Sequence, residues 1–137
     1  MKYIIMCGGR YTRWHVPRFL LKYEGEPIVL RIIRLLREAG VEDISISSND
    51  PALDQCGIPV LHHNNSYNIR KYNDFDGWWC DAFYPTDEPT CYIFGDVIYS
   101  PEAIKTIVDY KTDDIMFFGS RRPFAPEYPT SGRLMPS

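Results

Sequence analysis

The start of the chain places a short buried strand directly before a glycine pair. The run Tyr3–Cys7 consists of apolar and β-forming residues, and Gly8 and Gly9 close it. Five such residues ended by glycine are typical of a parallel strand that is covered on both faces. Parallel strands need long crossover connections, so the chain that follows is expected to contain helices between further strands.

An amphipathic helix is the next strong element, and we predict it from Pro27 to Ala39. Pro27 suits the first position of a helix, and Gly40 suits its C-terminal cap. Apolar side chains recur with helical spacing and form one stripe that faces the core. These residues are Ile28, Val29, Ile32, Leu35, Leu36 and Ala39.

The alternation of strands and helices continues along the chain. We predict strands at residues 43–47, 58–61, 91–94 and 115–118, and a short helix at 78–83 after a polar loop at 62–75. Ser100 is a suitable cap for a helix that runs to about Tyr110. Strands that alternate with helices predict an α/β fold with a mostly parallel sheet flanked by helices. We expect this domain to cover residues 1–120 and a Pro-rich irregular tail to cover residues 121–137.

The charge is unevenly distributed between the beginning of the chain and the remainder. Residues 1–37 hold eight Lys or Arg and two Glu, whereas the other hundred residues hold seven basic and sixteen acidic residues. A basic segment within a chain of net charge −3 indicates a local anionic ligand and argues against nucleic acid as a partner. Three of the basic residues, Arg31, Arg34 and Arg37, are interpreted as the solvated face of the predicted helix.

Other features exclude several classes of protein. There is no run of 18 or more apolar residues, so we expect no membrane partner and a cytoplasmic location. The four cysteines lack the spacing of a zinc site, and we interpret them as buried free thiols. They are Cys7, Cys56, Cys80 and Cys91.

The segment after the first strand has the composition of a phosphate-binding loop. Gly8 and Gly9 lie where ligands bind in open α/β sheets, and glycine allows the backbone N–H groups to approach phosphate closely. Thr12 adds a hydroxyl group, and three arginines add charge and planar donors that suit phosphate oxygens. The arginines are Arg10, Arg13 and Arg18. The segment matches neither a P-loop nor a dinucleotide-binding fingerprint.

Four motifs in this order resemble the N-terminal part of the sugar-phosphate nucleotidyltransferases. They are Cys-Gly-Gly-Arg-Tyr-Thr-Arg at 7–13, Pro17-Arg18, Gly25-Glu-Pro27 before a helix, and Gly95-Asp96 at a strand end. The related cytidylyltransferases and molybdenum-cofactor guanylyltransferases share the pattern. The resemblance covers roughly residues 1–110. It implies a Rossmann-like fold of the nucleotide-diphospho-sugar transferase type, shortened at the C-terminus.

The resemblance also implies a reaction and roles for individual residues. It implies Mg²⁺-dependent transfer of a nucleoside monophosphate from a nucleoside triphosphate to a small phosphorylated acceptor, with release of pyrophosphate. Arg13, Arg18 and Asp96 are the implied catalytic residues, and Asp96 is the implied Mg²⁺ ligand. The implied nucleotide-binding residues are Cys7, Gly8, Gly9, Arg10, Tyr11, Thr12, Arg13 and Asn73.

Two positions depart from the family pattern and leave an alternative open. Tyr11 stands where the family has a third glycine, and Arg18 stands where it has a lysine. The chain also lacks the C-terminal part in which relatives carry a second metal-binding acid. The alternative is therefore a truncated or degenerate nucleotide-binding module without turnover. A glycosyltransferase is less favoured because Asp96 is not part of an Asp-x-Asp motif. The sequence leaves a homo-oligomer open.

Overall fold

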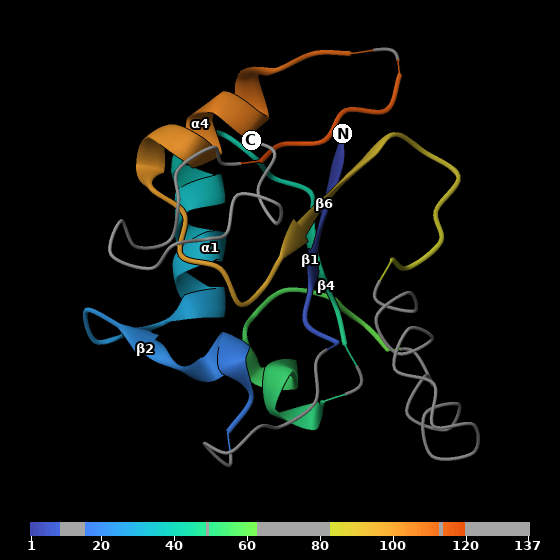
Figure 1. The fold of residues 1–137 in the computed structure, drawn as a ribbon. Helices are drawn as coiled ribbons and strands as arrows, with labels where there is room; N and C mark the ends of the chain where they lie inside the picture. The colour runs from blue at the N-terminus through green and yellow to red at the C-terminus, as the bar shows by residue number, and fades with distance from the viewer. Residues whose placement is uncertain (9–15, 49, 63–82, 113, 120–137) are drawn as a thin grey trace, which may run out of the picture.

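The computed structural model of the chain describes residues 1–8, 16–48, 50–62, 83–112 and 114–119 (Figure 1). Four strands form one sheet in the order β5-β4-β1-β6, and every neighbouring pair is parallel. The strands are β1 (Lys2–Met6), β4 (Ile44–Ser47), β5 (Val60–Leu61) and β6 (Thr90–Phe94). The predicted parallel α/β sheet is confirmed.

The first strand lies in the middle of the sheet because both of its faces are apolar. Tyr3 is paired with Ile44 of β4 on one side and with Cys91 of β6 on the other. Ile4 and Ile5 are fully buried although they point to opposite faces. Strand β4 is buried in the same way, although Ile and Ser alternate along it. Ser45 and Ser47 are buried as well, because β4 lies between β1 and β5.

Helix α1 (Ile28–Glu38) begins one residue later than predicted. Pro27 is extended, with ψ 139°, because it pairs with Lys22 in a small hairpin and serves as the N-cap. At the other end Gly40 has φ +92°, and its N–H donates to the carbonyl of Arg37 while Val41 N–H donates to that of Leu36. These two bonds form a Schellman motif, which confirms Gly40 as the residue that ends the helix.

Both described helices cover the same face of the sheet (Figure 1). Helix α4 (Pro101–Asp109) contributes Ile104, and α1 contributes the buried stripe that the sequence predicts together with Ile33. The cap of α4 is confirmed, since Ser100 Oγ accepts a hydrogen bond of 3.0 Å from Ala103 N–H. The side chains of β1, β4 and β6 that join this core are Tyr3, Ile5, Ile44, Ile46, Cys91 and Ile93.

The segment between Val16 and α1 contains regular structure that the sequence analysis did not predict. A short 3-10 helix, η1 (Arg18–Leu20), precedes an antiparallel hairpin of β2 (Lys22–Tyr23) and β3 (Glu26–Pro27). Glu24 and Gly25 connect the two strands with φ of 52° and 81°. Positive φ at both central residues is the pattern of a tight two-residue hairpin turn. Gly25 is typical of such a turn, but glutamate rarely adopts positive φ, so the sequence around Glu24 did not indicate it.

The strand predicted at 115–118 is wrong. This segment is irregular and lies on the surface, with Ile115 78% and Phe117 87% exposed. The apolar and aromatic residues favour a strand, but a strand needs a partner. No described residue pairs with the outer edge of β6. The strand predicted at 58–61 is present but shorter, as β5, and a 3-10 helix, η2 (Pro51–Gln55), precedes it.

Some predicted elements lie outside the described residues. The helix predicted at 78–83 is described only at Phe83, which lies at a bend and packs edge-on against Tyr92 at a ring distance of 5.2 Å. The tail at 121–137 also lies outside. Among the described helices, none is both long and apolar enough to cross a membrane.

Candidate functional site

The candidate site lies at the carboxyl ends of β1 and β6, where the order in which the chain adds strands to the sheet reverses. From β1 the chain proceeds to β4 and β5 on one side and then returns to β6 on the other side of β1. The carboxyl ends of β1 and β6 lie side by side at this point, because the two strands are paired along their length. Ligands of open α/β sheets bind at such a switch point. Gly8 follows β1 here, and Asp96 follows β6.

Backbone hydrogen bonds hold the strand ends together up to the site. Cys7 N–H donates to the carbonyl of Ser47 at 2.8 Å, and Gly95 N–H donates to that of Met6 at 2.9 Å. The first bond extends the β1–β4 pairing, and the second extends the β1–β6 pairing. Because of these bonds, Gly8 and Asp96 emerge from a rigid edge of the sheet.

Gly95 permits an unusually close approach between β6 and β1. A Cβ atom at this position would lie 2.5 Å from Cys7 Sγ and 2.8 Å from the carbonyl oxygen of Met6. Neither distance is compatible with a side chain, so the residue before Asp96 must be glycine for the strands to pair this closely. The role of Gly95 in this contact was not predicted from the sequence.

Arg18 and Asp96 meet beyond the carboxyl end of β6. Arg18 Nη1 lies 3.8 Å from Asp96 Oδ2, and their side chains are 54% and 37% exposed. Arg18 opens η1, which follows Pro17, whereas Asp96 follows β6. The structure thus brings together two of the three residues predicted to be catalytic. An exposed ion pair of this kind contributes little to stability, so its two charges can readily exchange partners.

The other predicted site residues divide into two groups. Cys7 and Gly8 are described and both are buried. The Cys7 side chain points into the core toward Gly95, so only its backbone could contact a ligand. The remaining predicted residues lie outside the described part of the chain, so their roles stay predictions. They are Gly9, Arg10, Tyr11, Thr12, Arg13 and Asn73.

Burial keeps the Cys7 thiol neutral. Removal from water raises the pKa of Cys7 well above its usual value, and the negative charge of Asp96 raises it further. At pH 8 we expect alkylation of Cys7 by iodoacetamide to be at least about tenfold slower than that of the half-buried Cys56. Mass spectrometry of digested samples would measure both rates. Equal rates in the folded protein, and not only in urea, would contradict the buried position.

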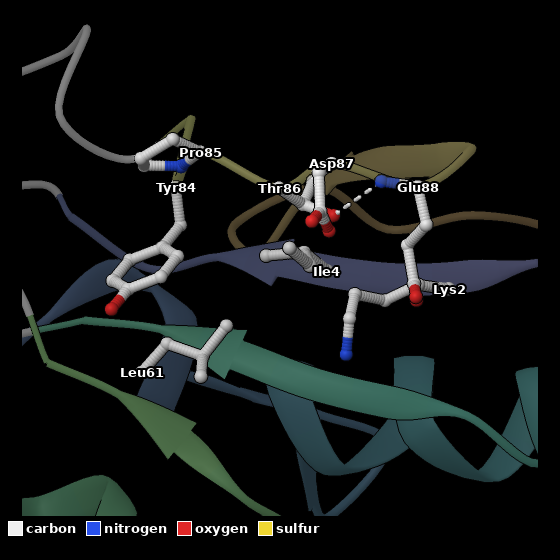
Figure 2. Close-up of a pocket in the computed structure, with 8 residues that line it drawn as sticks. All are labelled: Lys2, Ile4, Leu61, Tyr84, Pro85, Thr86, Asp87 and Glu88. Atoms are coloured by element: carbon white, nitrogen blue, oxygen red, sulfur yellow. Dashed lines mark hydrogen bonds between the residues drawn. The ribbon is translucent and has the colours of Figure 1, made fainter.

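A separate pocket of about 210 Å³ lies on the face of the sheet opposite α1 (Figure 2). Figure 2 shows the Tyr84 ring at one end and Lys2 with Glu88 at the other, with Ile4 between them. A hydrogen bond of 3.1 Å from Glu88 N–H to Thr86 Oγ1 shapes its wall. Neither Arg18 nor Asp96 lines this pocket, so it is distinct from the candidate site.

The fold and the position of the site define an α/β domain of the nucleotide-binding type. Residues 3–69 match the family model of the MobA-like NTP transferase domain. The match confirms the resemblance over these residues, which include three of the four motifs; Gly95-Asp96 lies beyond them.

One curated relative is a molybdenum cofactor guanylyltransferase from Xanthomonas euvesicatoria pv. vesicatoria (strain 85-10). The chain is 32% identical to it over 59 residues, which cover 43% of this chain and 30% of the relative. No solved structure matches the chain.

Proposed function

We propose that this chain binds a nucleoside triphosphate at the carboxyl ends of β1 and β6 and transfers its nucleotidyl group to a small phosphorylated acceptor. The observation that carries the proposal is the Arg18–Asp96 pair at the switch point of the sheet, with 3.8 Å between Arg18 Nη1 and Asp96 Oδ2. A metal–phosphate complex carries both positive and negative charge. The Asp96 carboxylate suits the metal ion, and the Arg18 guanidinium suits the phosphate oxygens.

The proposed reaction joins an acceptor oxygen to the α-phosphorus of the triphosphate. As that bond forms, the bond from the α-phosphorus to the bridging oxygen breaks, and pyrophosphate leaves. The guanidinium of Arg18 would stabilise the charge that develops on the α-phosphate oxygens. Backbone N–H groups after β1, beginning at Gly8, would bind the phosphates at this edge of the sheet.

Asp96 fits a Mg²⁺ ion that arrives with the triphosphate. Its carboxylate is exposed at the end of a fixed strand, and Mg²⁺ is commonly held by one or two carboxylates together with phosphate oxygens and water. When bound, Mg²⁺ would neutralise charge on the phosphates. Arg18 would then be free to turn from Asp96 to the α-phosphate, so that one ion pair is replaced by two contacts to substrate.

A pyrophosphate-release assay tests the proposed function. The purified chain would be incubated with Mg²⁺, each nucleoside triphosphate, and a panel of sugar 1-phosphates and phosphocholine. The relative's name adds a guanosine nucleotide with the molybdenum cofactor to this panel. We expect acceptor-dependent pyrophosphate release with at least one pair. Triphosphate binding in calorimetry without release for any acceptor would instead support a binding module, to which the arginine at position 18 also points.

A further inference from the structure

Arg31 on α1 contacts both segments that carry the Arg18–Asp96 pair. Its Nη1 donates a hydrogen bond to the carbonyl oxygen of Tyr99, in the loop between β6 and α4. Its guanidinium carbon lies 5.0 Å from the centre of the Tyr23 ring, in the hairpin after η1. The sequence placed Arg31 with Arg34 and Arg37 on the solvated face, yet it is half-buried between two segments.

The loop after β6 is held at its two ends and exposed between them. Gly95 N–H donates to Met6 at the beginning, and Ser100 caps α4 at the end. Between these points Asp96, Val97 and Ile98 are exposed. The hydrogen bond from Arg31 to the Tyr99 carbonyl joins α1 to this loop.

Tyr99 closes the same loop with its side chain. Its hydroxyl group donates to the carbonyl of Phe94, 3.4 Å away, and its ring packs against the core. Burial raises the pKa of Tyr99 to about 12, so the hydroxyl remains protonated as a donor at neutral pH. Tyr99 thus joins both ends of the loop that presents Asp96, and Arg31 fixes Tyr99.

The hairpin is the second segment that Arg31 contacts. Leu21 follows η1, and its carbonyl accepts a hydrogen bond of 2.9 Å from Ile28 N–H at the start of α1. Tyr23 lies two residues further along, with its ring under the Arg31 guanidinium. The cation–π contact therefore limits movement of the segment that presents Arg18.

We propose that Arg31 is a positioning residue that couples the Arg18 segment to the Asp96 loop and thereby sets the distance between the two charged groups. The inference rests on the proposed function for its consequence, because that distance matters only if the pair receives a metal–triphosphate complex. A planar guanidinium suits the role, since this group can donate hydrogen bonds in its plane while its face lies on an aromatic ring. Lysine can supply one of these contacts at a time.

Arg34 provides a matched control on the same helix. It contacts the hairpin through two hydrogen bonds to Glu26, of 3.0 and 3.1 Å, and it also binds Glu38. None of its described contacts reaches the loop after β6. Replacing Arg34 therefore loosens the hairpin alone, whereas replacing Arg31 loosens both segments.

Hydrogen exchange of the full chain tests the coupling without substrate. In Arg31→Met we expect amide exchange in peptides that cover 95–100 to become at least about tenfold faster, as expected for loss of a charge-assisted hydrogen bond. Arg31→Lys should show a smaller increase, and Arg34→Met none at these amides. Faster exchange throughout the sheet would indicate general destabilisation and overturn the proposal, as would unchanged exchange at 95–100.

Binding of Mg²⁺ with a triphosphate tests whether the position of Asp96 that Arg31 sets matters for the substrate. We expect Arg31→Met to weaken calorimetric binding about five- to tenfold, the size of a typical coupling between sites. The same substitution in an Asp96→Ala background should have little further effect, because the two residues act through one element. Additive losses would overturn a role through Asp96. If no triphosphate binds to the unmodified chain, the proposed function fails, while the exchange result still decides whether Arg31 holds the loop.

Discussion

Asp96→Ala is expected to lower pyrophosphate release at least about a hundredfold, the scale of losing a group that stabilises charge in the transition state. The carboxylate is exposed and contributes only an exposed ion pair with Arg18, so its removal should leave the fold intact. Initial rates at saturating triphosphate and several Mg²⁺ concentrations would measure the effect. Circular dichroism would show whether the variant remains folded.

A second acidic residue provides the control for this experiment. Asp87 is exposed and lines the separate pocket, so Asp87→Ala changes the net charge by the same amount away from the candidate site. We expect its rate to stay within about twofold, as for most surface substitutions away from a site. Release that survives in Asp96→Ala, or that falls equally in both variants, would exclude Asp96 as the metal-binding residue.

Gly95→Ala is expected to reduce both stability and activity. The added methyl group would lie 2.5 Å from Cys7 Sγ and 2.8 Å from the Met6 carbonyl oxygen, so β6 must move away from β1. Overpacking of this kind costs about 1–3 kcal/mol of unfolding free energy. Asp96 is the next residue and must move with the strand. Urea denaturation and pyrophosphate release would measure the two effects.

Two further variants identify the cause of the Gly95→Ala effect. Cys7→Ala removes the sulfur atom, so the double variant should be more stable than the sum of the single effects by at least about 0.5 kcal/mol. Recovery should be partial because the Met6 carbonyl remains in place. Gly119→Ala is the control, since a Cβ at that exposed position meets no atom within 4 Å. Strict additivity would show that the Cys7 contact does not cause the loss.

The helices and strands that pack in the core were predictable because local pattern and burial agree. The stripe of α1, the cap at Ser100 and the end at Gly40 all follow from residues within a few positions of one another. The segment at 115–118 has the same apolar character, but its placement depends on whether a distant strand lies beside it. Residue type alone does not contain that information, and the prediction there was wrong.

The candidate site also has one part that the sequence indicated and one part that it missed. The family resemblance implied that Arg18 and Asp96 belong to one site, and the structure places Arg18 Nη1 3.8 Å from Asp96 Oδ2. Arg31 was assigned to solvent because its helical position lies beside Arg34 and Arg37. Its partners, Tyr23 and Tyr99, lie in separate segments that approach α1 only in the folded chain.

The sequence by itself determined the parallel α/β class and the boundaries of the main helices to within about two residues, and it predicted the residues of the candidate site. These properties depend on periodicity, caps and motif order, which are local. The tertiary structure decided which strands are neighbours, that Gly95 must lack a side chain, and that Arg31 lies between the two segments of the site. Such contacts depend on how the elements pack around β1, because side chains far apart in the chain meet only after that packing is complete.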